Sequence, residues 1–377
     1  MAIVVVMAGG GTGGHVFPAL ALADTIRERE PRARVHFIGT ERGIERRLIP
    51  NAGYPLDLVA ARPVLGKGPV DHTRAALDAV RGVFRARKLL RAARADLVIG
   101  LGAYASFPTV AAAASLGLPI GLLQMDAQPG LANRILGRFA RSVFVQFAET
   151  ARRFAPGLAR VTGIPVRRMP DTATTVQRDS ETEAGLVRLL VFGGSQGARS
   201  LNRAVLANLP SLDSRDGFRI THQTGSAELA AVRDAYQKAG VEADIEAFYD
   251  DMLERIAHSD LVVARAGIST IAELCAAGVA SILVPHPHAA GHQAANARVL
   301  EQAGGCVVIR DSELEARLAE EVRGLARDPV RRRRMGEAAA AQSRSDAADH
   351  IWSICASWLE PGPKGLELQQ SRERHRS

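Results

Sequence analysis

The sequence contains little cysteine and few aromatic residues, and both shortages limit what the protein can be. Its three cysteines, Cys275, Cys306 and Cys355, are odd in number, and their spacing fits no metal or redox motif. We expect reduced thiols in a cytosolic protein. Aromatic residues make up 5% of the chain, and no RNP or zinc-finger pattern accompanies the net charge of +8. A nucleic-acid partner is therefore not expected.

Secretory and membrane-spanning segments are also missing from the sequence. The first seven residues carry no basic region and run straight into glycines, unlike a secretory signal. The longest apolar candidate, 110–123, is interrupted by Gly117 and Pro119, and a spanning helix needs about 18 to 20 apolar residues. The 377 residues, 47% hydrophobic and 23% charged, predict a soluble α/β protein with two cores.

Strand and helix patterns alternate along the chain, and the alternation starts twice. Buried strands are predicted at 3–7, 35–38, 96–100, 119–123, 142–146, 189–192, 219–222, 245–248, 261–264 and 281–284. Helices are predicted at 16–30 and 109–116. This order predicts two doubly wound domains with parallel sheets. The boundaries are placed at 1–165 and 166–345, with a helix at 346–360 returning to the first domain and a disordered tail at 361–377.

The first glycine-rich motif is Gly9-Gly-Gly-Thr-Gly-Gly-His15. Glycines permit positive φ and close backbone approach, and the helix start behind them suits an anion. A plain tight turn is the alternative, but it needs fewer glycines. The motif also fits G-x-G-x-x-G, yet the acidic residue of a dinucleotide site is poorly met by Glu41. No Gly-Lys-Ser/Thr follows, which disfavours ATP.

His15 lies at the expected helix start. The helix dipole there favours a neutral imidazole, which could take a proton from an attacking hydroxyl. A histidine that only makes local hydrogen bonds remains an equal alternative.

Two further segments have the pattern of phosphate sites. Gly193-Gly-Ser-Gln-Gly197 places Ser195 in a second glycine turn before a helix. In the segment Arg265–Glu273, Ser269 and Thr270 could hold phosphates, and Glu273 could accept both hydroxyls of a ribose. The alternative for Glu273 is a capping box. Two such loops on two domains suggest a ligand bound between them.

The segment 285–296 contains His286, His288 and His292. No carboxylate lies nearby, so a metal site is not expected. Gln293 and Asn296 are interpreted as hydrogen-bonding groups for sugar hydroxyls. Because the chain has no Asp-x-Asp, the charge of a leaving group would rest on helix starts and arginine.

The segment Arg81–Arg94 carries six basic residues around Val83, Phe84, Leu89 and Leu90. Such a basic, amphipathic helix fits an anionic membrane surface. A helix with a solvated basic face is the alternative.

Taken together, the motifs resemble the MurG family of bacterial glycosyltransferases of peptidoglycan synthesis. The resemblance rests on segments spread over most of the chain: 9–18, 163–167, 193–199 with Asn202, 265–273, and His292-Gln293 with Asn296. It implies a GT-B fold, UDP-N-acetylglucosamine as donor, and an undecaprenyl-diphosphoryl-muramoyl-peptide as acceptor. It also implies inversion without a metal or cofactor, and a peripheral place on the cytoplasmic face of the membrane.

The resemblance also assigns site residues. Thr12, Gly13 and Gly14 would lie near the donor sugar and the acceptor diphosphate. The residues expected to bind the donor are Arg167, Ser195, Ile268, Ser269, Thr270, Ile271, Ala272, Glu273 and Gln293. Tyr104, Asn202, Tyr249 and Arg265 are further candidates for substrate contact.

The chain departs from the family pattern at three places. It reads Leu123-Gln-Met-Asp126 where the family has His-Glu-Gln-Asn, and Gly102-Ala-Tyr104 where the family has Gly-Gly-Tyr. Tyr249 stands where a smaller aliphatic residue is common. The Asn that would contact the donor sugar is Asp126 in this chain, so Asp126 is expected to contact substrate and is also a second candidate base. Alternative functions are transfer to another lipid, nucleotide-sugar binding without catalysis and, more remotely, a nicotinamide-dependent dehydrogenase.

Overall fold

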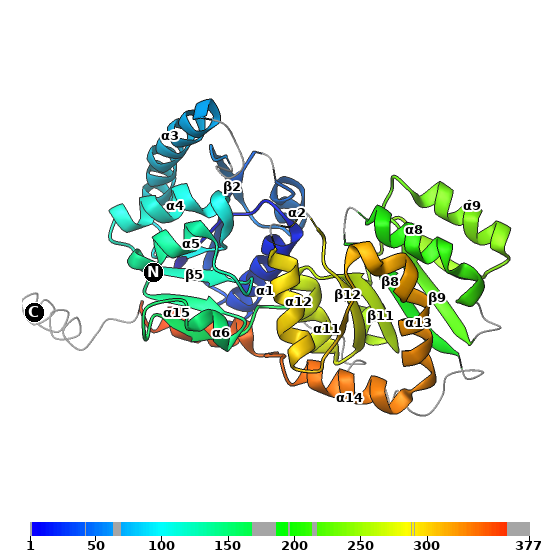
Figure 1. Ribbon diagram of the computed structural model, residues 1–377. Helices are drawn as coiled ribbons and strands as arrows, with labels where there is room; N and C mark the ends of the chain where they lie inside the picture. Colours follow the sequence, from blue (N-terminus) through cyan, green and yellow to red (C-terminus); the bar gives the residue numbers. More distant parts are fainter. Residues whose placement is uncertain are drawn as a thin grey trace, which may run out of the picture.

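The chain forms two α/β domains side by side, each built on one parallel sheet (Figure 1). This computed structural model describes residues 2–359 except Arg42, 63–68, 168–185, 195–196, 213–216, His288 and Ala290. The predicted tail at 361–377 lies outside the described residues, as does most of the segment between the two sheets.

The first sheet has seven parallel strands in the order β3-β2-β1-β4-β5-β6-β7. The strands are β1 Val4–Ala8, β2 Arg34–Thr40, β3 Leu56–Val59, β4 Leu97–Gly100, β5 Ile120–Gln124, β6 Ser142–Val145 and β7 Ala159–Val161. The helices are α1 Gly13–Arg29, α2 Glu45–Asn51, α3 Pro69–Ala93, α4 Ala103–Ser115, α5 Leu131–Leu136 and α6 Ala148–Ala151, with a 3-10 turn η1 at Gly137–Phe139.

The second sheet has six parallel strands in the order β10-β9-β8-β11-β12-β13. The strands are β8 Val187–Phe192, β9 Phe218–Gln223, β10 Ala243–Glu246, β11 Leu261–Arg265, β12 Ala280–Val284 and β13 Val307–Val308. The helices are α8 Arg199–Ala207, α9 Leu229–Ala239, α10 Met252–Ala257, α11 Ile268–Ala277, α12 His292–Gln302, α13 Leu314–Arg327 and α14 Pro329–Ala340. The 3-10 turns η3 Leu209–Ser211 and η5 Asp311–Glu313 complete it.

The predicted fold class is confirmed, and all ten predicted strands are present within two residues of their expected positions. Three strands at or next to sheet edges, β3, β7 and β13, were missed because they are short and only partly buried. Two helices begin earlier than predicted: α1 starts at Gly13 and α4 at Ala103.

The chain returns to the first domain at its last described helix, α15 Ala347–Ala356 (Figure 1). It packs on α1, where Arg29 Nε contacts Asp349 Oδ1 at 2.6 Å. Ile351 is fully buried in the core of the first domain. Beyond the helix, the ring of Trp358 stacks on Phe144 of β6, with ring centroids 6.3 Å apart.

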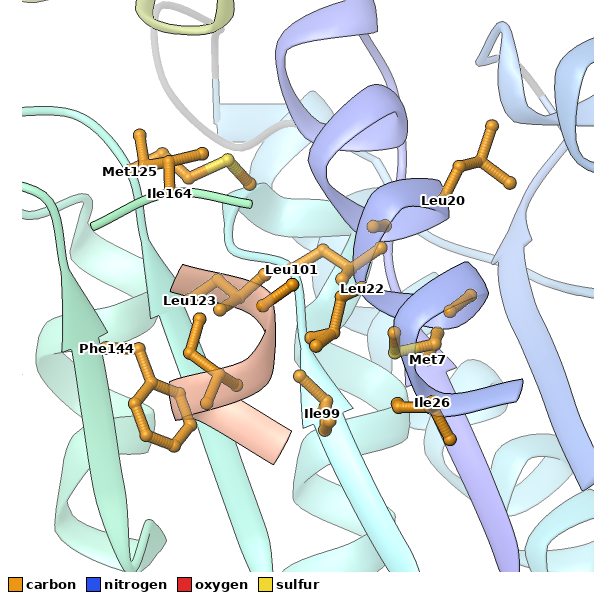
Figure 2. Packing of buried hydrophobic residues seen from close by; sticks show 14 of the residues in the cluster. Met7, Leu20, Leu22, Ile26, Ile99, Leu101, Leu123, Met125, Phe144 and Ile164 are labelled. Atoms are coloured by element: carbon orange, nitrogen blue, oxygen red, sulfur yellow. The ribbon is translucent and has the colours of Figure 1, made fainter. Parts of the chain in front are cut away.

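The core between the first sheet and α1 extends into the second domain. Figure 2 shows Met7, Leu22, Ile99 and Leu123 packed between helix and strands. Ile268 and Ala272 of α11 belong to the same buried cluster. The starts of α1 and α11 therefore meet where the two domains join. This point lies at the carboxyl ends of both parallel sheets, where ligands of such folds bind.

Candidate functional site

The first glycine-rich loop connects β1 to α1 and has the backbone that its sequence demands. Gly9, Gly10 and Gly11 have φ of 131°, 156° and 101°, and a φ of 101° to 131° is accessible mainly to glycine. Gly13 and Gly14 form the first turn of α1. The loop thus delivers a helix start, whose free N–H groups favour an anion, to the domain junction.

His15 lies in the first turn of α1 with its ring half-buried. Its Nδ1 is 3.0 Å from Thr12 Oγ1. Burial lowers the pKa of His15, and nearby His292 lowers it too, while the charges of Asp126 and Glu45 raise it. Burial prevails, so the imidazole is neutral near neutral pH and can accept a proton.

Asp126 reaches the same place from the loop after β5, and it contacts the second domain directly. Asn296 of α12 donates a hydrogen bond from Nδ2 to Asp126 Oδ1 at 2.9 Å. The Oδ1 of Asn296 accepts the N–H of Ala127 at 2.8 Å. The amide of Asn296, which is fully buried, therefore joins the two domains beside His15.

The residues that replace the family pattern before Asp126 fix this loop from within. Gln124 donates from Nε2 to the carbonyl oxygen of Asp126 at 2.8 Å. Asn133 of α5 donates to the Gln124 Oε1 and to the Leu123 carbonyl oxygen, both at 2.9 Å. Met125 lies in the buried core. The departure from the family sequence thus forms an ordered, hydrogen-bonded loop.

The second glycine-rich loop connects β8 to α8, and its glycines Gly193 and Gly197 leave no space for a side chain. Gly194 has open space around it but a φ of 85°. A Cβ on Gly197 would lie 2.2 Å from the Thr224 carbonyl oxygen. Ser195 lies outside the described residues, so its predicted contact with the donor stays a prediction. Gln223 at the end of β9 donates from Nε2 to the Gly194 carbonyl oxygen at 2.8 Å and so anchors the loop.

Asn202 lies behind this loop in a buried polar network. Its Nδ2 donates to the Thr224 carbonyl oxygen at 3.0 Å and to Glu228 Oε2 at 2.6 Å. Its Oδ1 is 3.2 Å from Nε2 of His222, whose pKa burial lowers to about 4. The side chain of Asn202 is thus engaged within the protein, and its direct contact with a substrate stays a prediction.

Arg265 at the end of β11 is also engaged within the second domain. Its Nη1 pairs with Asp311 Oδ1 at 2.6 Å, and its Nη2 donates to Ser200 Oγ at 2.5 Å. Burial raises the pKa of Asp311, but the hydrogen bonds from Ser200 and Arg265 outweigh burial, so the pKa lies below its usual value. Arg265 thus links β11, α8 and η5, and its role at a leaving group stays a prediction.

The start of α11 provides the predicted nucleotide segment, Ile268–Glu273. A pocket at the domain junction is lined by side chains from α1, α11 and the segment leading out of the first domain. They are Phe17, Pro18, Pro165, Val166, Arg167, Ser269, Ala272 and Glu273. Ile268, Ile271 and Ala272 are buried and Thr270 is half-buried. Burial raises the pKa of Glu273 to about 7, against the charge of Arg167, which lowers it.

Three further candidates for substrate contact, Tyr249, Gln293 and Tyr104, differ in how far their side chains are buried or bonded within the protein. Tyr249 is buried, and its hydroxyl donates to Asp244 Oδ1 at 2.9 Å while Arg255 lies over its ring at 3.8 Å. Gln293 Oε1 accepts the N–H of His286 at 2.9 Å. Tyr104 is half-buried in the first turn of α4.

The structure thus gathers several predicted groups at the domain junction: His15, Asp126, Arg167, Ser269 and Glu273. The described residues hold no group of three or more His, Cys, Asp or Glu side chains suited to a metal ion. His288 lies outside the described residues.

Sequence reasoning missed the buried carboxylate of Glu45 beneath the first loop. It also missed the effect of His292 on His15. The two glycines that precede Glu45 closely in the sequence, Gly39 and Gly43, were the available signal for a buried side chain at Glu45.

Comparison with known proteins agrees with this geometry. The family model described as the glycosyltransferase family 28 N-terminal domain matches residues 5–145, and that described as its C-terminal domain matches 188–351. A protein of Myxococcus xanthus is 40% identical over 369 residues, covering 96% of this chain and 95% of its own. One of Anaeromyxobacter dehalogenans is 43% identical over 352 residues, covering 93% and 91%. Both are named UDP-N-acetylglucosamine–N-acetylmuramyl-(pentapeptide) pyrophosphoryl-undecaprenol N-acetylglucosamine transferase.

Solved structures give the same picture. The crystal structure of Acinetobacter baumannii MurG has a TM-score of 0.74 and 27% identity, covering 94% of this chain and 99% of its own. A UDP-N-acetylglucosamine 2-epimerase of Listeria monocytogenes, titled as putative, has a TM-score of 0.66 at 16% identity, covering 96% and 97%. The second likeness shows the fold alone. Together with the two parallel sheets, these neighbours confirm the GT-B architecture.

Proposed function

The chain belongs to glycosyltransferase family 28, and on that premise we propose that it transfers N-acetylglucosamine from UDP-N-acetylglucosamine to N-acetylmuramyl-(pentapeptide) pyrophosphoryl-undecaprenol. This is a step of peptidoglycan synthesis. The observation that carries the proposal is the identity of 40–43% with transferases of that name over more than nine-tenths of the chain. The junction of α1 and α11 supports the proposal, because it brings a candidate base close to the expected nucleotide segment.

The donor would lie on the second domain with its nucleotide at the start of α11. Ser269 and the N–H groups of that helix start suit the diphosphate. Glu273 suits the ribose hydroxyls, which donate hydrogen bonds to a carboxylate. Arg167 lines the same pocket and adds a positive charge opposite the diphosphate. Departure of UDP would then be assisted by helix-start dipoles and arginine without a metal.

The acceptor hydroxyl would approach from the first domain, and His15 or Asp126 would take its proton. For His15 Nε2 to act, Nδ1 must carry the ring hydrogen and donate it to Thr12 Oγ1, which the 3.0 Å separation allows. Attack on the face opposite UDP inverts the anomeric carbon. The oxygen gains its bond to C1 as the bond from C1 to the diphosphate oxygen breaks.

A transfer assay tests this function. Radiolabelled UDP-N-acetylglucosamine is supplied with the lipid-linked monosaccharide, and the labelled lipid-linked disaccharide is measured. We expect His15→Ala or Asp126→Asn to lower kcat by at least about 100-fold, the size of general-base catalysis. If both variants keep near-wild-type turnover, neither residue is the base. Binding of donor with no transfer would point to a non-catalytic protein, and transfer to a different lipid would replace the proposed acceptor.

We further propose that α3 and α5 form the surface that meets the membrane. Leu77, Val80 and Phe84 follow one face of α3 and are more than half exposed, Phe84 to 71%. Leu131 and Ile135 of α5 are also exposed, and α4 packs against both helices (Figure 1).

Exposed basic residues accompany these apolar side chains, namely Arg81, Arg85 and Lys88 on α3 and Arg134 on α5. Apolar side chains among basic ones suit an anionic lipid surface. No helix among the described residues is long and apolar enough to cross a membrane.

Vesicle sedimentation tests this surface. Phe84→Ser is expected to reduce binding to vesicles that contain phosphatidylglycerol while leaving turnover on a detergent-solubilised acceptor unchanged. Val330, an exposed apolar residue of α14, supplies the control substitution Val330→Ser. Equal losses for the two variants would contradict the assignment of α3.

A further inference from the structure

A buried carboxylate lies beneath the first glycine-rich loop. Glu45, at the start of α2, is fully buried. Its Oε2 accepts the N–H of Gly11 at 2.8 Å. Its Oε1 accepts the N–H of Thr40 at 3.1 Å and the Thr40 hydroxyl at 2.9 Å. The carboxylate therefore ties the loop after β1 to the end of β2.

Three glycines provide the space that this side chain occupies. A Cβ on Gly10, Gly39 or Gly43 would lie 2.4, 2.8 or 1.7 Å from the nearest atom of Glu45. Gly10 lies in the loop after β1, Gly39 in β2 and Gly43 in the turn before α2, and all three lack a side chain next to Glu45. The ion pairs among the described residues include none to Glu45, so hydrogen bonds and glycine packing hold it. Burying a carboxylate in this way is costly, which argues for a role in the adjoining site.

The adjoining site is the His15 region. Gly11, which Glu45 holds, is followed by Thr12, and Thr12 Oγ1 is 3.0 Å from His15 Nδ1. The charged groups that act on His15 come from three directions: Asp126 from the loop after β5, Glu45 from α2, and His292 from α12. Asp126 and Glu45 oppose burial and favour the imidazolium, whereas His292 disfavours it.

We propose that Glu45 is a positioning residue of the transfer reaction: it fixes the Gly9–Gly11 loop so that Thr12 and His15 face the acceptor hydroxyl, and its charge stabilises the imidazolium formed on His15. The proposal rests on the transfer function given above, with His15 as base. In that step the hydroxyl proton passes to His15 Nε2, and the oxygen bonds to C1 as UDP leaves with the electron pair of the broken bond.

The same geometry limits what the loop can bind. The N–H of Gly11 is occupied by Glu45 and the N–H of Gly9 by the Ile38 carbonyl oxygen at 2.9 Å. These two N–H groups are therefore not available to a ligand anion, which the helix start at Gly13 and Gly14 suits instead.

The test compares Glu45→Gln with Glu41→Gln, since Glu41 is an exposed carboxylate four residues earlier. Glu45→Gln keeps the shape of the side chain but removes its charge and faces an amide group toward a backbone N–H. We expect kcat to fall about 10- to 100-fold with the KM for UDP-N-acetylglucosamine nearly unchanged. The acidic limb of the kcat–pH profile, which reports His15, should move down by about half to one pH unit because a negative neighbour is lost. Glu41→Gln should alter neither.

Thr40→Val separates the charge from the anchoring. It removes one hydrogen bond but leaves the carboxylate in place, so it should lower kcat less and leave the acidic limb where it is. An unmoved limb in Glu45→Gln, or normal kcat, overturns the proposal.

If Glu45→Gln fails to fold, Glu45→Asp decides instead. The shorter side chain keeps the charge but withdraws it from Gly11, and a normal kcat in that variant also overturns the proposal. Absence of transfer by the wild-type protein would refute the transfer function itself, whereas activity in the wild type with unaffected Glu45 variants would refute only this inference.

Discussion

The side-chain amide of Asn296 donates to Asp126 Oδ1 at 2.9 Å across the domain junction, while its oxygen accepts the N–H of Ala127 at 2.8 Å. One residue of the second domain thus contacts both a side chain and the backbone of a loop in the first domain. The loop belongs to the segment where the chain departs from its family pattern. Because Asp126 also acts on His15, this contact couples the relative position of the domains to the candidate base.

Replacing Asn296 should weaken both the junction and the reaction. In Asn296→Ala the buried N–H of Ala127 loses its partner, which costs about 1–3 kcal/mol. We expect a lower free energy of unfolding in urea and a lower kcat/KM. Arg298, which is exposed on the same helix, supplies the control Arg298→Ala, where neither quantity should change. An unaltered free energy of unfolding in Asn296→Ala would show that this contact does not stabilise the domain junction.

The raised pKa of Glu273 predicts that donor binding depends on pH. Burial raises its pKa to about 7, so the carboxyl is largely protonated at pH 6 and ionised at pH 8. The ionised form is the stronger acceptor for both ribose hydroxyls, because protonation turns one carboxyl oxygen into a donor. The affinity for UDP-N-acetylglucosamine should therefore rise up to about tenfold between pH 6 and pH 8. Calorimetric titration measures this change.

The matched variant is Glu273→Gln, which cannot ionise. Its affinity should be low and flat over the same interval. The diphosphate of UDP-N-acetylglucosamine is a diester and does not titrate between pH 6 and pH 8, so the slope reports the protein. A slope that persists in Glu273→Gln would place the titrating group elsewhere.

The fold could be predicted from the sequence because buried parallel strands are continuous apolar runs. Val4–Ala8 and Leu261–Arg265 are buried along their whole length, so the apolar pattern identifies them. Leu56–Val59 is only partly buried and carries no such signal. The predicted start of α4 at 109 came too late because Ala103–Phe107 has no apolar periodicity of its own. Its helical start is set by the turn at Gly102.

The site was predictable in its motifs but not in its contacts. Glycine loops and the Ser269–Glu273 segment are local patterns whose chemistry follows from residue type. The pairs Asp126–Asn296 and Glu45–Gly11 join residues 170 and 34 positions apart, and no local pattern encodes them. For the same reason the sequence could not show that Arg265 is paired with Asp311.

Ala103 has a backbone conformation that its side chain disfavours. Its φ is 57°, in the left-handed region, which costs a non-glycine residue about 1–2 kcal/mol. Glycine also loses more backbone entropy on folding, so Ala103→Gly should stabilise the protein by roughly 0.5–1 kcal/mol. Urea denaturation measures this. The control is Ala111→Gly in the middle of the same helix, which should destabilise by about 1 kcal/mol. A loss of stability in Ala103→Gly would refute the strain.

Gly14 tests whether the start of α1 receives a ligand. A Cβ there would lie 3.8 Å from Thr12 Oγ1 and 3.9 Å from Ile268 Cγ2, which is ordinary contact. Its φ is not among the positive values, so Gly14→Ala should fold and gain up to about 1 kcal/mol of helix stability. The added methyl group would nevertheless stand where the acceptor diphosphate and donor sugar are expected to approach the helix N–H groups. We therefore expect KM to rise about tenfold or more while the melting temperature stays level or rises.

The control for this substitution is Gly324→Ala in α13, where the space around the Cβ is open. It should raise stability similarly and leave KM unchanged, because that helix lies away from the domain junction. If Gly14→Ala behaved like Gly324→Ala, the glycine would serve only the loop, and the ligand would lie further from α1 than the motif implies. A raised KM in Gly14→Ala but not in Gly324→Ala would mean that the substrate occupies the space beside Gly14, because no residue of the folded chain fills it.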